Sequence, residues 1–312
     1  MEVCPDIQQT QRRHLTAPAI AGLTWPIVLA VLLGAVLHAS WNALVKSGGD
    51  KPVDTALLHV MASLVALPLL LWIGAPPLAA LPYLGASLVV HIGYYITLAG
   101  AYKHGDLGLT YPIMRGSAPL LVALSSAALL DESPSAFAWA GVLGITAGVA
   151  LVGLSARALD QALHHRRALA FALTNAVFIA VYTLIDASGV RVTAGHGHAA
   201  ASYVLLLTAL DGIPYGLLVW RGRDAASRRA ILAYARQRWP IATLGGAASM
   251  GSYAIALWAM TRAPVASVAA LRETSVLFAA VLGTWLLKER FGLQRALGTA
   301  VIVGGVMALR LG

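Results

Sequence analysis

The stretch YPIMRGSAPLLVALSSAALLDE, residues 111–132, decides the fold, because a related stretch recurs later in the chain. It lies without a gap on VAALRETSVLFAAVLGTWLLKE, residues 268–289. Each copy has an arginine inside an apolar run and an acidic residue at the end of that run. The match extends over residues 102–151 and 259–308. It pairs Arg115 with Arg272, Glu132 with Glu289, Gly141 with Gly298 and Gly148 with Gly305.

The composition around these copies is that of a membrane protein. Hydrophobic residues make up 59% of the chain and charged residues 11%, and the mean hydropathy is +0.75. A helix of roughly 20 apolar residues crosses a bilayer, and lipid offers no partner to irregular backbone. We therefore predict an all-α polytopic membrane protein with ten transmembrane helices. The expected spans are 18–45, 55–73, 83–102, 107–130, 137–154, 168–187, 199–220, 241–260, 264–287 and 291–309.

The repeat also predicts how the two halves are arranged. A weaker match lays Ser40-Trp41-Asn42 on residues 181–183. Five spans per half is an odd number, so the second copy enters the membrane from the opposite side. Such inverted repeats are common in secondary transporters, with the substrate site between the halves. The expected domains are a polar tail (1–16), a first five-helix repeat (17–155), a basic linker (156–167) and a second five-helix repeat (168–312).

Cysteine, charge and motif content exclude several classes of function. The only cysteine, Cys4, cannot form an internal disulfide or a cysteine-built metal site. The net charge of +9 comes from loops between helices, which lack the interleaved aromatics of a nucleic-acid surface and instead suit lipid headgroups. No nucleotide-binding, zinc-protease or nucleophile motif is present in the sequence. We expect no catalytic residue, metal or cofactor, and a proton gradient remains a candidate energy source.

Loop charges give an orientation. Most lysines and arginines fall on one side of the predicted membrane, including Lys51, Lys103 and Arg223. The other side carries Arg12, Arg13, Arg191, Arg262 and Arg310. Because cytoplasmic loops are enriched in Lys and Arg, this distribution puts both termini outside the cell.

Several motifs identify a family that the chain resembles. HASWNALVK, residues 38–46, closes the first span, and the acidic end at Asp131-Glu132 recurs as KER at residues 288–290. With the paired glycines, these motifs resemble the drug/metabolite transporter superfamily, in particular its EamA-type members. The resemblance implies a ten-helix bundle in the cell (inner) membrane, with a central cavity that moves small organic solutes, often outward. It also implies cytoplasmic termini, against the charge distribution. The two glycine-containing helices are also compatible with packing across a homodimer.

Charged residues inside the spans are candidates for function, since a charge in the bilayer is costly. Arg115 lies between Pro112 and Pro119, which remove helix hydrogen bonds, and its guanidinium suits a carboxylate or phosphate. Arg272 is its repeat partner. We expect both to bind an anionic group of the substrate. A structural ion pair between Arg115 and Glu273 is the alternative for this site.

Three residues are candidates for proton coupling: Glu273, His91 and Asp186. Burial and neighbouring charges move carboxyl groups toward the working pH, and histidine titrates near neutrality. The alternatives are a structural ion pair for Glu273, a packed hydrogen-bond donor for His91, and a residue at headgroup level for Asp186. His59 and Asp211 also fall inside predicted spans, with weaker reasons for a role.

Aromatic and amide side chains are expected to shape the cavity. Trp41 and Asn42 lie near the end of the first span, Tyr95 lies one turn after His91, and Tyr182 is the repeat partner of Trp41. Helix packing is the alternative for each. The sequence thus predicts a secondary transporter, by efflux or exchange, for a small polar metabolite such as an amino acid or organic anion. The rivals are a non-transporting lipid-handling or accessory protein, an intramembrane enzyme, and a multidrug or cation exporter.

Overall fold

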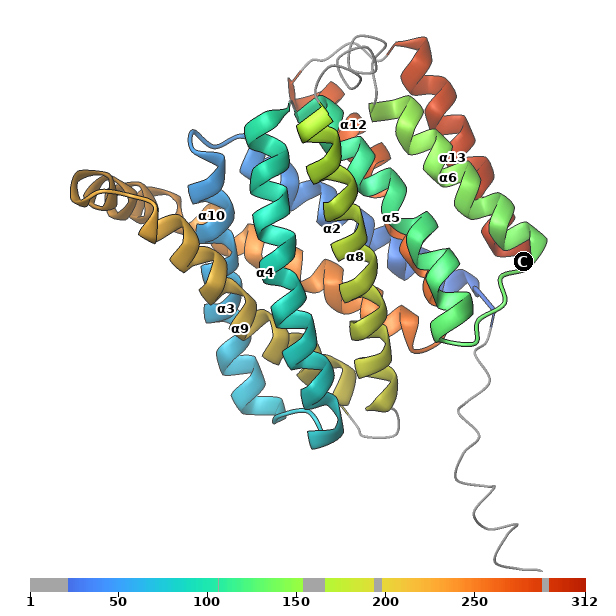
Figure 1. Ribbon diagram of the computed structural model, residues 1–312, viewed down its shortest axis with the longest axis horizontal. Helices are drawn as coiled ribbons and strands as arrows, with labels where there is room; N and C mark the ends of the chain where they lie inside the picture. Colours follow the sequence, from blue (N-terminus) through green and yellow to red (C-terminus); the bar gives the residue numbers. More distant parts are fainter. Residues whose placement is uncertain (1–21, 106, 154–165, 194–197, 288–291) are drawn as a thin grey trace, which may run out of the picture.

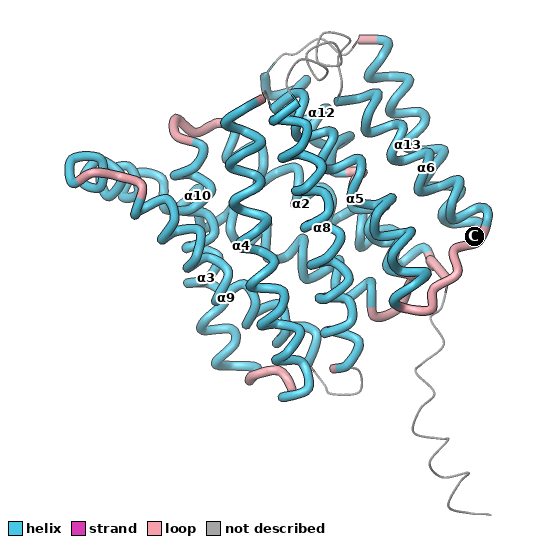
Figure 2. The backbone as a smooth tube through the Cα atoms, in the orientation of Figure 1, coloured by secondary structure: helices cyan, strands magenta, loops and turns pink. Residues whose placement is uncertain are grey.

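A computed structural model describes residues 22–105, 107–153, 166–193, 198–287 and 292–312. Its regular elements in these ranges are all helical (Figure 1, Figure 2). The first repeat comprises α2 (Trp25–Lys46), α3 (Lys51–Ile73), the 3-10 turn η1 (Leu78–Ala80), α4 (Leu81–His104), α5 (Leu107–Leu129) and α6 (Ala136–Gly153). The second comprises α8 (Arg166–Val192), α9 (Ala199–Arg221), α10 (Ala225–Met260), α11 (Val265–Arg272), α12 (Ser275–Leu287) and α13 (Leu293–Leu311).

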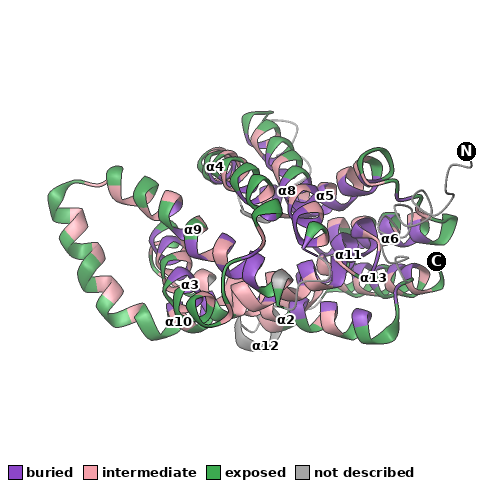
Figure 3. Cartoon of the chain, turned by 90° about the horizontal axis from the view of Figure 1, so that it is seen from below, coloured by how far each residue is buried: buried purple, intermediate pink, exposed green. Residues whose placement is uncertain are grey.

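The bundle has the length and surface of a membrane domain. Within the described ranges, nine helical stretches are long and apolar enough to span a membrane, and α13, the repeat partner of α6, adds a further long helix. Exposed residues lie mainly on the outward faces of the helices (Figure 3), and they include large apolar side chains such as Leu71 and Trp72. These faces suit lipid. The prediction of an all-α fold with two inverted five-helix repeats is confirmed.

Contacts between helices follow a pseudo-two-fold axis. α4 packs on α8 as α10 packs on α2, and α5 packs on α8 as α12 packs on α2. The pairs α3–α9, α6–α13 and α5–α11 each join a helix to its own repeat partner. Most of the packing therefore runs between the repeats rather than within one, and any space enclosed at the centre has walls from both halves.

Helix ends follow local sequence signals. Asp50 caps the start of α3 by accepting a hydrogen bond from the backbone N–H of Val53 at 3.2 Å, and Pro52 stands in its first turn. Gly74 ends α3 with φ +88°, a backbone conformation that residues other than glycine rarely adopt. Asp224 caps α10 in the same way through the N–H of Ser227.

Two expected helix starts were wrong. The first span was expected from residue 18, but the first helix of the described residues begins at Trp25, where Pro26 fits the first turn, and residues 22–24 are not helical. Residues 18–21 lie outside the described part. The eighth span was expected from residue 241, but α10 already begins at Ala225 and its first half projects from the bundle (Figure 1). The capping signal at Asp224 explains this early start. The tail 1–16 and most of the linker 156–167 lie outside the described residues.

The ninth span, expected as one helix over 264–287, is interrupted after Arg272. There the backbone N–H groups of Glu273 and Thr274 bond to carbonyls three residues earlier, at 3.0 and 3.2 Å. The hydroxyl of Thr274 also donates to the carbonyl of Leu271 at 2.7 Å. Such side-chain bonds to the backbone compete with the helix. The interruption lies directly beside the charged pair of residues 272 and 273.

The α6–α13 seam, formed by Gly141, Gly148, Gly298 and Gly305, joins the ends of the two repeats. A Cβ on Gly305 would lie 2.8 Å from the backbone N of Ile145, and one on Gly148 would lie 2.8 Å from the carbonyl of Gly298. Only glycine permits so close an approach. The two helices run antiparallel, as inverted repeats require.

Both ends of the described chain lie on the same side of the bundle. The guanidinium of Arg310, near the end of α13, stacks over the ring of Trp25 at 5.6 Å. Trp25 is the first residue of α2. An even number of spans accounts for this arrangement.

Candidate functional site

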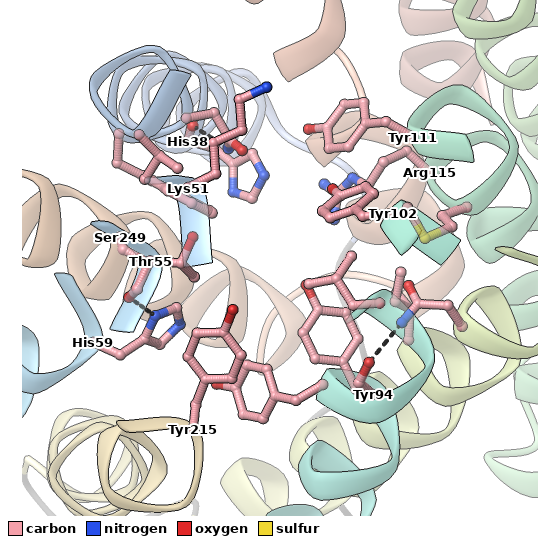
Figure 4. A pocket seen from close by; sticks show the side chains of 18 of the residues that line it. His38, Lys51, Thr55, His59, Tyr94, Tyr102, Tyr111, Arg115, Tyr215 and Ser249 are labelled. Atoms are coloured by element: carbon pink, nitrogen blue, oxygen red, sulfur yellow. Dashed lines mark hydrogen bonds between the residues drawn. The ribbon is translucent and has the colours of Figure 1, made fainter. Parts of the chain in front are cut away.

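A cavity of about 1280 Å³ lies between the two repeats (Figure 4). Lys51, Lys103 and Arg223, at helix ends on the basic side of the bundle, line its mouth. The cavity extends inward to residues such as Ala62 and Tyr182, which are well inside their helices. Among the described residues that line it, none belongs to the opposite ends of these helices. The cavity therefore opens to the basic side.

The opposite side is closed by a cluster around Glu132. Arg191 Nη2 lies 2.6 Å from Oε1 of Glu132, and Arg191 Nε donates to the carbonyl of Met260 at 2.8 Å. The same carboxylate accepts the backbone N–H of Val265 at 2.9 Å, at the start of α11. A carboxylate at a helix N-terminus is stabilised by the helix dipole. This Glu132–Arg191 cluster joins both repeats across the closed end.

Arg115 forms a buried ion pair within the bundle. Its Nε lies 2.8 Å from Oε2 of Glu273, and both side chains are less than one-tenth exposed. The N–H is not aligned for a hydrogen bond, and Nη2 of Arg115 has no hydrogen-bond partner among the described residues. The ion-pair alternative for Arg115 is thus present in the structure. The guanidinium still lines the cavity and keeps an unused donor.

Arg272 has a different environment. It is half-buried, lines the cavity, and lies over the ring of Tyr253 at 5.3 Å. No carboxylate of the described residues lies within ion-pair distance of it. An arginine over an aromatic face is held in place by the ring without being neutralised. Arg272 therefore places on the cavity wall a positive charge that no carboxylate of the described residues pairs with directly.

Asp186 is fully buried in α8, which continues beyond it to Val192. The hydroxyl of Tyr203 donates to its Oδ1 at 2.7 Å, and the hydroxyl of Tyr253 donates to its Oδ2. Both carboxylate oxygens thus have tyrosine donors. Tyr253 connects this carboxylate to Arg272, because its hydroxyl binds Asp186 and its ring faces the guanidinium.

Aromatic side chains cover much of the remaining wall. His91 stacks on Tyr182 with ring centroids 4.4 Å apart, and His91 Nδ1 lies 2.9 Å from the carbonyl of Ser87. Trp41 packs edge-on against His38 at 5.0 Å, and its buried Nε1 has no hydrogen-bond partner in the described part. An unused indole donor beside a cavity suits an acceptor on a bound solute.

The amides near the cavity serve mainly as helix contacts. Asn42 donates from Nδ2 to the carbonyl of His38 at 2.8 Å within α2, although its side chain lines the cavity. Asn175 donates to the carbonyl of Tyr94 at 2.9 Å and to the hydroxyl of Thr97 at 3.0 Å. These bonds join α8 to α4, as hydrogen bonds between membrane helices do.

A family model described as the EamA-like transporter family matches residues 25–154 and 166–311, once for each repeat. The chain belongs to this family. EamA proteins are membrane transporters of the drug/metabolite superfamily, so the chain is a multi-pass member of a transporter family. A solved structure described only as "Crystal structure of protein" is similar in fold, with a TM-score of 0.67 and 18% identity over 90% of this chain and 98% of that one. No curated protein matches the chain.

In this EamA protein, the six residues predicted to bind substrate all line the cavity: Arg115, Arg272, Trp41, Asn42, Tyr95 and Tyr182. Of the three proton-coupling candidates, His91 lines it. Glu273 and Asp186 are buried behind residues that do, each bound to its own partners. Their roles remain predictions.

Three further tyrosines, which the sequence did not single out, also belong to the cavity wall. Tyr102, Tyr111 and Tyr215 line the cavity of this EamA protein. Tyr215 lies one helical turn after Asp211 inside an apolar span, and a charge with an aromatic four residues later was the available signal.

Proposed function

We propose that the protein is a secondary active transporter, for efflux or exchange, of a small polar organic metabolite with an anionic group, such as an amino acid or another organic anion. It would act in the cell (inner) membrane by alternating access. One observation carries the proposal: Arg272 lies on the cavity wall with no carboxylate of the described residues in ion-pair distance. A charge that deep in a membrane protein needs a partner or water. A bound anion supplies the partner.

The surrounding donors support an anion at this place. Nη2 of Arg115 and Nε1 of Trp41 are buried beside the same cavity without hydrogen-bond partners in the described part. Each unsatisfied buried donor destabilises the empty state by about 1–3 kcal/mol. A carboxylate or phosphate between them would accept these bonds and compensate the charge of Arg272. Asn42, Tyr95 and Tyr182 would set the shape and polarity of the rest of the site.

Access to one side at a time has support in the asymmetry of the cavity. Its mouth is on the basic side, and the Glu132–Arg191 cluster closes the other end. Inverted repeats exchange these two states by rocking one half against the other around a fixed site. Opening the closed end requires the contacts of Glu132 with Arg191 and Val265 to separate.

Proton coupling is part of the proposal. His91 is the candidate in contact with the cavity, through its stacking on Tyr182. Glu273 and Asp186 would exchange protons only when their partners move, because arginine or tyrosine donors occupy them in this state. The bilayer is the partner on the outer surface. A homodimer and the domain limits at 17–155 and 168–312 remain proposals.

Transport by the Arg272→Gln variant tests the proposal. A thermal-shift screen of metabolites on the detergent-purified protein first selects stabilising anions, and flux of the selected anions is then measured in proteoliposomes. We expect Arg272→Gln to lose saturable flux while eluting as a folded protein. The matched control is Arg262→Gln, because Arg262 also lies over an aromatic ring of α10, Trp258 at 4.6 Å, but outside the cavity. Normal flux in Arg272→Gln would refute the anion site.

A further inference from the structure

We propose that Asp211 forms, with Tyr95, Tyr215 and His59, a second subsite that binds a protonated amine. The transported solute would then carry an ammonium group in addition to its anionic group. This inference rests on the proposed function and specifies the substrate class of the same cavity.

Asp211 lies in α9, lines the cavity and is half-buried. The hydroxyl of Tyr95 donates to its Oδ2 at 2.5 Å. The other oxygen, Oδ1, is buried and has no hydrogen-bond partner among the described residues. A buried carboxylate oxygen without a donor is unfavourable. A ligand with N–H groups would satisfy it.

The buried acids of the described part each have hydrogen-bond donors or an ion-pair partner. They are Asp54, bound by Arg238 and Tyr234; Glu132, by Arg191 and Val265; Asp186, by Tyr203 and Tyr253; and Glu273, paired with Arg115. None of these four acids lines the cavity. Oε2 of Glu273 also lacks a hydrogen bond, but it lies 2.8 Å from Nε of Arg115. Asp211 differs from the four acids because it lines the cavity and its free acceptor, Oδ1, has no ion-pair partner in the described part of the chain.

Aromatic rings surround this carboxylate. Tyr95 and Tyr215 lie 4.7 Å apart between ring centroids, and His59 packs edge-on against Tyr95 at 5.7 Å and Tyr215 at 6.0 Å. Cations are attracted to the faces of such rings. His59 Nδ1 lies 2.8 Å from the carbonyl of Thr55, which can only accept, so Nδ1 carries the hydrogen. In the neutral ring Nε2 is then an acceptor as well.

The Asp211 subsite faces the arginines from another wall. Figure 4 shows His59 and Tyr215 on one side of the cavity and Arg115 with Tyr102 and Tyr111 on the other. Arg115 and Arg272 are carried by α5 and α11, which pack on each other, whereas Asp211 is carried by α9, which packs on α3 and α10. The cavity thus has a positive pole and a negative pole on separate walls. A solute with both charges complements it.

Binding of matched ligands tests the inference on the detergent-purified full chain. The probes are phenylalanine with 3-phenylpropanoate and phenethylamine, leucine with 4-methylpentanoate and isopentylamine, and serine with 3-hydroxypropanoate and ethanolamine. Within each set, the members have both charges, the carboxylate alone or the amine alone. In at least one set we expect the amino acid to bind the wild type about tenfold or more tightly than its carboxylate analogue.

Two variants test whether Asp211 and Tyr215 cause the tighter binding of the amino acid. Asp211→Asn keeps an acceptor for Tyr95 and should bring the ratio of the two affinities near one, while the carboxylate analogue keeps its affinity. Tyr215→Leu, which leaves the bond between Tyr95 and Asp211 in place, should reduce the ratio less. The control is Asp224→Asn, the same substitution at the exposed helix cap outside the cavity. In Asp224→Asn, the ratio of the affinities for the amino acid and the carboxylate analogue should equal that of the wild type.

Three results would overturn the inference. The first is the absence of an amine preference in every set. The second is an equal loss of affinity for the amino acid and the carboxylate analogue in Asp211→Asn, which means a structural role. The third is a changed pH profile of flux in Asp211→Asn with an intact amine preference, which means a proton site. If carboxylates are transported without amine preference, the proposed anion transport stands and only the role of Asp211 falls.

Discussion

The two arginine sites of the repeats differ although the sequence pairs them. In the register that lays Arg115 on Arg272, Glu273 falls on Gly116. The second repeat therefore carries an acid that the first lacks. Glu273 reaches across the α5–α11 contact and pairs with Arg115, at 2.8 Å. Position 116 has no side chain to return the contact, and Arg272 is left over Tyr253.

The inequality of the two arginines shows how a symmetric fold acquires a polar site. Two paired arginines would make a neutral, cross-linked core, and two unpaired ones would repel each other in a medium of low dielectric. One acid for two arginines fixes the first guanidinium and leaves the second available. We therefore expect Arg115 to hold the repeats together and Arg272 to make the larger contribution to binding.

The largest expected effect comes from Glu273→Gln. It leaves Arg115 buried without a counter-charge, which destabilises a protein by about 3–5 kcal/mol. The midpoint of thermal unfolding of the detergent-purified variant, followed by tryptophan fluorescence, should fall accordingly. Arg272→Gln removes no ion pair and should unfold near the wild-type temperature.

A double-mutant cycle separates the pair from other effects. The variant Arg115→Gln with Glu273→Gln removes both charges and should recover much of the lost stability, because neither partner is left unpaired. If Glu273→Gln alone unfolds like the wild type, the contact between the two side chains contributes nothing and the comparison between the repeats loses its basis.

The next prediction supplies the missing acid. Gly116→Glu gives the first repeat the residue of the second, and a Cβ there would meet Val149 and the carbonyl of Thr146 at ordinary contact distances of 3.8 and 3.9 Å. A carboxylate paired with Arg272 would displace the anion. We expect an affinity loss of about 10- to 100-fold, the range of one charged hydrogen bond. Gly116→Gln, with the same length and no charge, should lose far less.

Much of this fold could be read from the sequence because its signals are local and repeated. Apolar runs located the spans, and the gapless match gave the inverted repeats. The interruption at Arg272 could not be read, since residues 264–287 have the length and hydropathy of one span despite the polar run at 272–275. At the interruption the hydroxyl of Thr274 donates to the carbonyl of Leu271, a contact that hydropathy does not contain.

The site was predictable by residue but not by contact. Composition identifies a charge inside a span, but not the residue that it meets. Composition could not decide that Glu273 pairs with Arg115 rather than with the adjacent Arg272. It also could not show that two tyrosines donate to Asp186. The negative pole at Asp211 depends on helices α4 and α9 meeting, which is a property of tertiary packing.

The glycine seam tests the part of the molecule in which the repeats are alike. Gly305→Ala places a Cβ 2.8 Å from the backbone N of Ile145 and 3.0 Å from the carbonyl of Gly141, so α6 and α13 must separate. Overpacking of this kind destabilises by about 1–3 kcal/mol. The matched control is Gly304→Ala, whose Cβ meets nothing within 4 Å. Equal unfolding temperatures for the two variants would contradict the close seam.

The smallest expected effect separates the two contacts of Tyr253, the residue between Arg272 and Asp186. Tyr253→Phe keeps the ring under Arg272 and removes the hydroxyl that donates to Asp186, so stability should fall by about 1 kcal/mol while anion affinity stays near that of the wild type. Tyr253→Leu removes the ring as well, and anion affinity should then fall because the guanidinium loses its support. Thermal unfolding and anion titration on the same preparations measure both. If Tyr253→Phe already lowers affinity as far as Tyr253→Leu, the hydroxyl and Asp186 belong to the binding site, and the positive pole extends beyond Arg272.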